Sequence, residues 1–136
     1  MKIISIMLTI IFGGCNFAPN EPPHEPPQVI AHQQISSQEA QRMMDYYDVI
    51  ILDVRTQEEF DGGHIQDAIV LPYDEIAERA ESVIADRQQI VLIYCRTGRR
   101  SEIAARSLVY MGFTRVYDFG GIVDWTGEII ETTIKE

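Results

Sequence analysis

Three short, continuously apolar runs constrain the fold of this chain most strongly. They lie at residues 49–52, 68–71 and 90–94, and the stretches between them carry apolar residues at helical spacing. A run that is apolar at every position predicts a strand covered on both faces, because a strand with one face in solvent alternates polar and apolar residues. Buried strands that alternate with helices predict a parallel α/β sheet with helices on both faces.

Helical patterns with recognisable ends separate these runs. Ser36 and Glu39 form an S-x-x-E capping pattern before the first helix. Residues 74–85 are expected to be helical and residues 58–61 to form a short helical turn. The last helix is expected to end at Gly112, a residue suited to a left-handed helix stop, and a further strand to follow at 115–117. Five apolar or small residues recur at helical spacing in that last helix: Ile103, Ala104, Ser107, Leu108 and Met111.

Length and charge limit the classes of function. The chain has 136 residues, which suffice for one domain core but not for two. A formal net charge of −10 argues against nucleic acid as a partner and against attachment to an anionic membrane by charge alone. His24, His32 and His64 are not clustered with each other or with a cysteine at ligand spacing, so no metal site is expected.

The first 14 residues have the pattern of an export signal. Lys2 precedes an apolar segment at 3–12, which is shorter than the roughly 20 residues that a membrane-spanning helix needs. Two glycines before Cys15 resemble a bacterial lipoprotein processing site, at which the cysteine receives lipid and becomes the new N-terminus. We therefore expect an exported lipoprotein, anchored in the bacterial cell envelope on its periplasmic or extracellular face. An ordinary cleaved signal and an uncleaved anchor are the alternatives.

A proline-rich segment at residues 15–34 predicts an extended tether before the folded domain at 35–131. Residues 132–136 would form a short C-terminal tail. If Cys15 carries lipid, Cys95 is the one thiol left in the mature chain, and an unpaired thiol in an exported protein is a candidate reactive group. Five of the six prolines lie in the tether: Pro19, Pro22, Pro23, Pro26 and Pro27.

Cys95 stands at the turn between the strand at 90–94 and the last helix. The backbone N–H groups of such a turn point into its concavity and form an anion-binding nest, which lowers the pKa of a thiol at its centre. Arg96, Arg99 and Arg100 crowd the same short stretch of an otherwise acidic chain. The alternative is a buried cysteine followed by a solvated basic turn, and the arginine cluster favours the reactive thiol.

Several motifs together resemble the single-domain rhodanese family over residues 35–131. The resemblance implies a doubly wound parallel sheet in a single domain, and it implies sulfur transfer without a cofactor. In that family a cysteine takes a sulfane sulfur from a donor such as thiosulfate, becomes a persulfide, and passes the sulfur to cyanide, a thiol or a protein acceptor. Gln66-Asp67 stand where the family usually has Pro-Gly. The matching motifs are Asp53-Val54-Arg55, Glu59-Phe60, Gly63-His64-Ile65, Ala68, Pro72, residues 94–101, Gly112-Phe113, Gly120-Gly121-Ile122 and Trp125.

The resemblance and the loop chemistry assign roles to the candidate site. Cys95 is the expected nucleophile, and its persulfide anion would be held by backbone N–H groups. Arg100 is expected to turn inward and fix the shape of the loop, whereas Arg96 and Arg99 face the mouth and attract anionic donors. The expected substrate- and persulfide-binding residues are Arg96, Thr97, Gly98, Arg99, Arg100 and Ser101.

Four further residues are expected to have structural roles rather than to react. Asp53 and Arg55 follow the strand at 49–52, and Arg55 is expected to pair with Glu58 or Glu59 in a partly buried ion pair. His64 could serve as a base for Cys95, but a thiolate stabilised by the nest needs none, so a structural role is favoured. Trp125 is expected to anchor the core or the rim.

Two other functions are compatible with parts of the pattern. Cysteine-based phosphatases and arsenate reductases also hold a thiolate in an anion nest, but they need five residues between the cysteine and the arginine. Only residues 96–99 separate Cys95 from Arg100, so the loop is one residue short. The other alternative is a non-enzymatic module that senses sulfur or oxidants or binds a partner. Inactive members of such families typically lack the cysteine, which this chain keeps.

Overall fold

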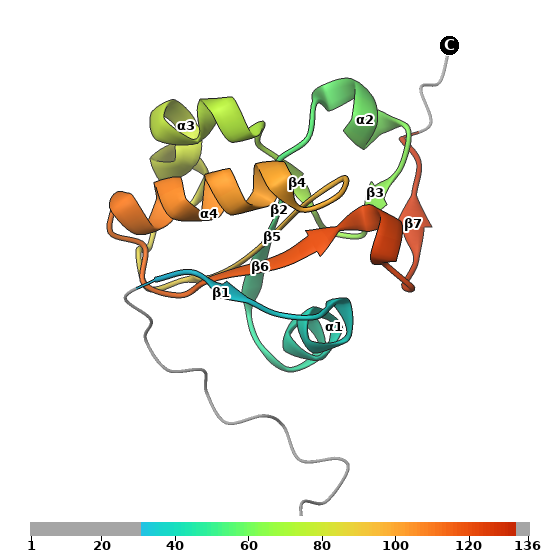
Figure 1. The fold of residues 1–136 in the computed structure, drawn as a ribbon, viewed down its shortest axis with the longest axis horizontal. Coiled ribbons are helices and arrows are strands. Elements are labelled where there is room, and N and C mark those ends of the chain that lie inside the picture. Colours follow the sequence, from blue (N-terminus) through green and yellow to red (C-terminus); the bar gives the residue numbers. More distant parts are fainter. Residues whose placement is uncertain (1–30, 133–136) are drawn as a thin grey trace, which may run out of the picture.

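The apolar runs form the centre of a parallel sheet. The computed structural model describes residues 31–132, and its five-stranded sheet has the order β1-β6-β5-β2-β4 with every neighbouring pair parallel (Figure 1). All positions of the central strand β5 are buried, as its unbroken apolar sequence predicts. The strands are β1 (Gln33–Gln34), β2 (Val49–Asp53), β4 (Ile69–Val70), β5 (Ile90–Cys95) and β6 (Val116–Gly121).

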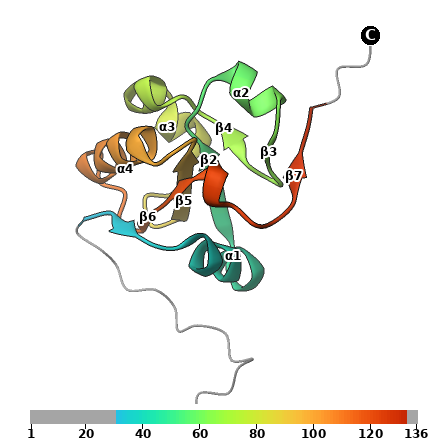
Figure 2. The same ribbon diagram turned by 45° about the vertical axis from the view of Figure 1, so that its right-hand side comes forward.

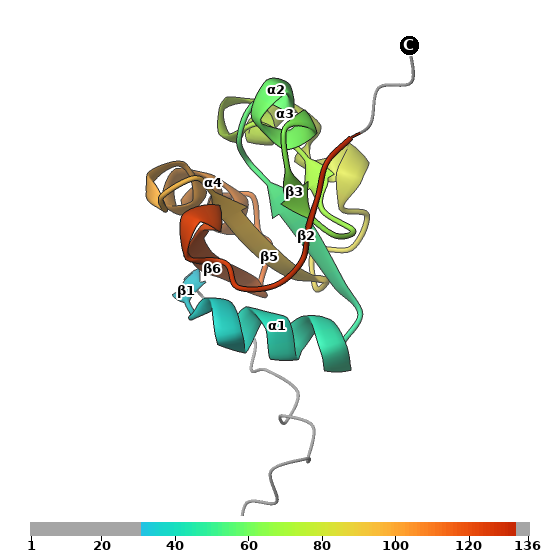
Figure 3. The same ribbon diagram turned by 90° about the vertical axis from the view of Figure 1, so that its right-hand side faces the viewer.

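Helices cover both faces of this sheet. Figures 1 and 3 show α3 (Ile76–Val83) and α4 (Arg99–Tyr110) on one face and α1 (Ser37–Tyr46) on the other. The short helix α2 (Gln57–Asp61) lies near the end of the sheet at which β2 and β5 terminate. Two hydrophobic clusters fill the two layers, one including residues of α3 and α4 and the other residues of α1. The predicted doubly wound α/β architecture is thereby confirmed.

Three strands of two residues each were not predicted from the sequence. β1 pairs with β6 and lies directly before residue 35, at which the domain is expected to begin. β3 (His64–Ile65) and β7 (Ile129–Ile130) pair antiparallel and form a separate small sheet, which Figure 2 shows beside the main one. Strands of this length show no recognisable periodicity, because the alternation of a strand is read over about four or more residues.

The helix caps differ in detail from the sequence prediction. Ser36 caps α1 by accepting a hydrogen bond from the N–H of Glu39 at 3.1 Å, but the Glu39 carboxylate lies 3.7 Å from Arg42. A complete capping box occurs instead at α2, where Thr56 and Glu59 each accept a hydrogen bond from the other's N–H. This reciprocal bonding explains how a helix of five residues begins at a defined point.

The buried face of α4 is shifted from the predicted one. Ala104 and Leu108 are buried as expected, but Ile103 is 39% exposed and Ala105 is buried in its place. Gly112 has a positive φ of 95° directly after the helical turns, which confirms the left-handed stop. The predicted helix at 74–85 is divided into a 3-10 turn (Tyr73–Glu75) and α3.

The predicted signal peptide at 1–14, the lipid site Cys15 and most of the tether at 15–34 lie outside the described residues, as does most of the tail at 132–136. Among residues 31–132, no helix combines the length and the hydrophobicity that crossing a membrane requires.

Candidate active site

Cys95 lies at the carboxyl end of the central strand β5, the edge at which parallel α/β sheets place their functional groups. The chain leaves the strand through residues 96–98 and enters α4 at Arg99. Gly98 makes this short connection with a positive φ of 110°, a conformation that costs glycine little. Cys95 is only 1% exposed, so the thiol sits at the bottom of the loop.

Hydrogen-bond donors surround the Cys95 sulfur. The backbone N–H of Gly98 donates to Sγ at 3.0 Å. The thiol in turn donates to Oγ of Ser101 at 3.7 Å, and that hydroxyl donates to the Gly98 carbonyl at 2.9 Å. Burial raises the pKa of the Cys95 thiol, but hydrogen bonds from the Ser101 backbone and hydroxyl and from the Gly98 and Thr97 backbone outweigh it, so the pKa lies below its usual value. The loop therefore favours a thiolate at this position.

Arg100 is held by an acidic partner. Its two terminal nitrogens lie 2.7 and 2.8 Å from the two carboxylate oxygens of Glu59, which α2 supplies. Hydrogen bonding to Arg100 lowers the pKa of Glu59 to about 2. The same pair raises the pKa of Arg100, and the negative charge of Cys95 contributes in the same direction, so Arg100 stays charged beside the thiolate.

Arg96 and Arg99 are the exposed cations beside the thiol, and neither forms an ion pair with a residue of 31–132. Arg115 has a partner of its own. The acidic chain thus presents uncompensated positive charge beside Cys95, which attracts anions to the loop. The arginines that pair with an acidic residue are Arg42, Arg55, Arg79, Arg87, Arg100 and Arg106.

A cavity of about 400 Å³ adjoins the loop on the side of β1 and β6. Thr97, Gly98 and Arg99 contribute to its lining together with the buried Asp118, but Cys95 does not. A molecule in this cavity would therefore contact the outer surface of the loop rather than the sulfur.

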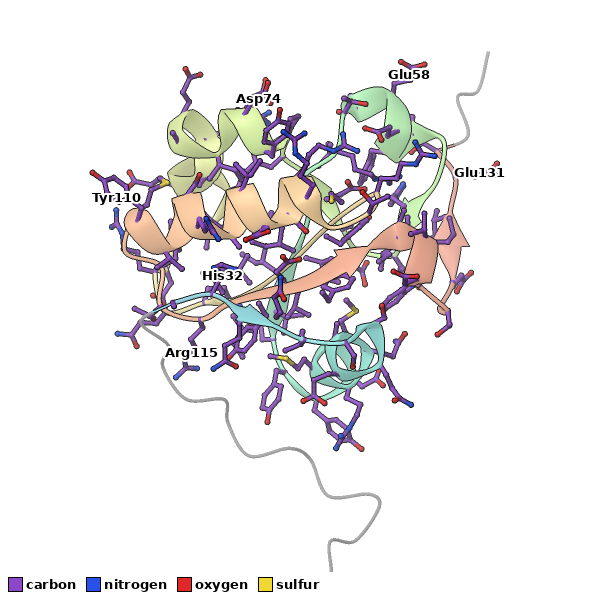
Figure 4. All side chains as sticks on the ribbon, viewed as in Figure 1. His32, Glu58, Asp74, Tyr110, Arg115 and Glu131 are labelled. Atoms are coloured by element: carbon purple, nitrogen blue, oxygen red, sulfur yellow. The ribbon has the colours of Figure 1, made fainter. Side chains whose placement is uncertain are left out.

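Asp53 and Arg55 form a buried ion pair with each other, which corrects the prediction that Arg55 pairs with Glu58 or Glu59. The Arg55 side chain donates to both Asp53 oxygens, with Nε at 2.9 Å from Oδ1 and Nη2 at 2.6 Å from Oδ2. Glu59 is occupied by Arg100, and Figure 4 shows Glu58 pointing outward from α2. A buried guanidinium needs a close carboxylate, and the nearest one lies two residues away on the same strand end.

Tyr94 extends this ion pair into a network. Its hydroxyl donates to Asp53 Oδ2 at 2.7 Å and accepts a hydrogen bond from the N–H of Ile65 at 3.1 Å. Burial, followed by the negative charge of Asp53, raises the pKa of Tyr94 well above its usual value, so the hydroxyl keeps its proton. Arg55 also donates to the carbonyl of Gly63 at 2.6 Å. The network therefore fixes the segment that follows α2, the helix that carries Glu59.

His64 has structural contacts and forms no hydrogen bond with Cys95 among residues 31–132. Its ring nitrogen Nδ1 lies 2.9 Å from the carbonyl oxygen of Phe60, and because a carbonyl only accepts, Nδ1 carries the proton. The imidazole also stacks on the Phe60 ring at a centroid distance of 3.7 Å. Trp125 donates from Nε1 to the Glu128 carbonyl at 3.3 Å and is partly buried beside Phe119.

Two site residues were not assigned their observed roles from the sequence. Glu59 holds Arg100, and the Thr56-x-x-Glu59 capping pattern was the available signal that this side chain is fixed. Tyr94 places a polar hydroxyl at the end of an otherwise apolar strand. A buried tyrosine hydroxyl usually has a hydrogen-bond partner, and this was the available signal for the network. Among the described residues, no group of three or more histidine, cysteine, aspartate or glutamate side chains is placed to hold a metal ion.

Comparisons with known proteins agree with this geometry. Residues 36–128 match the family model of the rhodanese-like domain. The chain is 41% identical over 87 residues to a sulfurtransferase of Allochromatium vinosum, covering 63% of this chain and 79% of that protein. It is 37% identical over 95 residues to the thiosulfate sulfurtransferase GlpE of Coxiella burnetii, covering 69% and 87%. A solved structure of a rhodanese with anions from E. coli aligns with a TM-score of 0.59 and 33% identity over 62% of this chain and 99% of that one.

Proposed function

The chain belongs to the rhodanese family, and on that premise we propose that it is a sulfurtransferase that carries sulfur as a persulfide on Cys95. The proposal rests on the environment of the Cys95 sulfur. The sulfur is buried, it accepts a hydrogen bond from the loop, and the pKa of the thiol lies below its usual value. A thiolate is the form of cysteine that attacks sulfur. Relatives named as sulfurtransferases support the same class of reaction.

In the first half-reaction the Cys95 thiolate attacks the outer sulfur of thiosulfate. A bond forms between Sγ and that sulfur, the sulfur–sulfur bond of thiosulfate breaks, and its electron pair leaves with sulfite. The product is a persulfide anion, so the negative charge moves outward by one sulfur atom. The backbone N–H groups of residues 96–101 are suited to hold this anion as an oxyanion hole holds oxygen.

In the second half-reaction a thiophilic acceptor attacks the outer sulfur of the persulfide. With cyanide the new bond joins carbon to sulfur, thiocyanate leaves, and the electron pair of the broken bond restores the Cys95 thiolate. The nearly complete burial of Cys95 favours donors and acceptors that present a small or terminal reactive atom. Arg96 and Arg99 would draw anionic donors to the mouth.

The position of Arg100 supports sulfur over phosphate as the transferred group. Both terminal nitrogens of the Arg100 guanidinium donate to the Glu59 carboxylate, which draws this arginine to α2. The loop is also one residue shorter than a phosphate requires. Both features favour a smaller ligand at Cys95.

The test is transfer of sulfur from thiosulfate to cyanide by the purified protein. We expect the wild type to form thiocyanate and Cys95→Ser to form none. Cys15→Ala is the matched control, because it removes the other cysteine of the chain and should keep the rate. A Cys95→Ser protein that keeps the wild-type rate would show that Cys95 is not the nucleophile.

We also propose that the domain works outside the cytoplasm, anchored through lipid on Cys15. The apolar segment that ends in Gly-Gly-Cys supports this location, and a diacyl anchor suffices for stable membrane residence because each buried CH₂ contributes about 0.8 kcal/mol. Fatty-acid labelling with membrane fractionation tests it, and Cys15→Ala should release or mis-process the protein. A wild-type protein found unlabelled in the cytosol would refute the location and leave the Cys95 chemistry standing.

A further inference from the structure

Gly121 lies beside Cys95 at the end of the sheet. The two residues are partners in the pairing of β5 with β6, at a point where the register of the two strands shifts. Gly121 is buried, and its φ of −116° and ψ of 144° describe an extended backbone that any residue can adopt. Backbone conformation therefore does not explain a glycine at this position.

The reason lies in the space above Gly121. A Cβ atom added there would lie 2.7 Å from the Cα of Thr97 and 2.8 Å from the carbonyl carbon of Arg96, and would overlap the Arg96 carbonyl oxygen. These are backbone atoms of the loop that follows Cys95, so no side-chain rotation could relieve the contact. The loop rests directly on the α-carbon of Gly121.

One hydrogen bond fixes the loop to the same segment. The backbone N–H of Val123 donates to the Arg96 carbonyl oxygen at 3.4 Å, and this is the oxygen that a Cβ at Gly121 would strike. The next residues of the loop, Thr97 and Gly98, supply N–H groups that stabilise the Cys95 sulfur as an anion. A displacement that begins at Arg96 is thus transmitted to these donors.

We propose that Gly121 is a positioning residue for Cys95, because its missing side chain lets the loop at 96–98 approach β6 closely enough to direct its N–H groups at the sulfur. This inference rests on the proposed sulfur transfer for its role in activity, but the geometry of the thiol can be measured independently of that activity. A methyl group at Gly121 would lift the loop and leave Cys95 with weaker hydrogen bonds.

The test is Gly121→Ala, read out by the pH dependence of Cys95 alkylation and by the rate of sulfur transfer. Because the hydrogen bonds to Sγ lower the thiol pKa, we expect the midpoint of the alkylation profile to move to higher pH in the variant. A displacement of the reacting groups by up to about one ångström lowers the rate by about tenfold to a hundredfold. We expect kcat/KM of the variant to fall by a factor of that size.

Two other glycines provide controls. Gly62→Ala adds a methyl group where the nearest atoms lie 3.6 Å away, and it should change neither melting temperature nor alkylation profile. Gly112→Ala strains a residue with a φ of 95° far from the loop, so it should lower the melting temperature and leave the alkylation profile unchanged. This second variant separates general destabilisation from displacement of the loop.

The outcomes distinguish this inference from the proposed function. A folded Gly121→Ala protein with the wild-type alkylation profile would overturn the positioning role. So would a variant that fails to fold while Gly112→Ala folds, because the sheet rather than the loop would then require the glycine. A shifted profile in a protein whose wild type transfers no sulfur would uphold the positioning role and refute only the proposed reaction.

Discussion

The guanidinium of Arg100 and the carboxylate of Glu59 form a bidentate ion pair with N–O distances of 2.7 and 2.8 Å. The pair joins the first turn of α4 to α2, two elements distant in the sequence. Thr56 also donates to this carboxylate, from its backbone N–H and its hydroxyl to Oε2. Glu59 thus connects the cap of one helix to the residue that closes the loop around Cys95.

This pair predicts a pH-dependent stability. The folded-state pKa of Glu59 is about 2, below the usual value of 4.5, so its contribution is complete above about pH 4.5 and is lost as the pH falls towards 2. Glu59→Gln should lower the free energy of unfolding by about 1–2 kcal/mol at neutral pH and by much less near pH 3. Denaturant unfolding at both pH values measures this difference.

Glu58→Gln is the matched control, because Glu58 belongs to the same helix and points outward (Figure 4). It should change stability little at either pH. A loss for Glu59→Gln that is equal at neutral and acid pH would contradict the assignment of the low pKa to this pair.

Ser101→Ala should raise the pKa of Cys95. The Ser101 backbone N–H and hydroxyl both lower the pKa of the Cys95 thiol. The hydroxyl lies 3.7 Å from Sγ and donates to the Gly98 carbonyl, and alanine removes this hydroxyl alone, so a partial rise in the pKa is expected. The measurement is the rate of Cys95 alkylation against pH. Ser107→Ala, on the same helix with its hydroxyl bonded to the Ile103 carbonyl, should leave the profile unchanged. An unshifted profile in Ser101→Ala would show that the hydroxyl does not act on the sulfur.

Arg96 and Arg99 should promote capture of an anionic donor. Replacing both with alanine is expected to raise the KM for thiosulfate by about tenfold and to change kcat less, since the charges attract the donor without bonding to Cys95. The difference in KM between the wild type and the double variant should decrease as salt is added. Arg106→Ala is the control, because Arg106 pairs with Glu102 farther along α4. A KM that is unchanged in the double variant would remove these arginines from donor binding.

Tyr94→Phe should destabilise the domain through its buried network. The change leaves the buried Ile65 N–H without its partner and removes one of the hydrogen bonds to Asp53 Oδ2, which keeps those from Arg55, at a cost of about 1–3 kcal/mol. Tyr117→Phe is the matched control. The Tyr117 hydroxyl is buried and has no hydrogen-bond partner among residues 31–132, so its removal should be neutral or stabilising. Equal losses in the two variants would show that the network contributes nothing specific.

The sheet and the place of Cys95 could be predicted because their signals are local and repeated. The unbroken apolar run at 90–94 predicts a buried strand, and a cysteine between such a strand and a helix must lie at the functional edge of the sheet. The left-handed end of α4 at Gly112 could be predicted from the glycine alone, because glycine is the residue that most readily adopts a positive φ. Each of these inferences needs only neighbouring residues.

The side-chain pairing around the site could not be predicted in the same way. Arg55 has several carboxylates nearby in sequence, and the choice of Asp53 depends on which of them is buried with it. Glu59 meets Arg100 because the fold brings α2 to the start of α4. The close approach of the loop to Gly121 likewise appears only when β5 and β6 are placed side by side.

The most direct test of the account is the intact mass of the purified protein after treatment with thiosulfate and removal of the excess. We predict a gain equal to the mass of one sulfur atom in the wild type, reversed by cyanide, retained in Cys15→Ala and absent in Cys95→Ser. An unchanged wild-type mass, or the same gain in Cys95→Ser, would contradict a persulfide on Cys95.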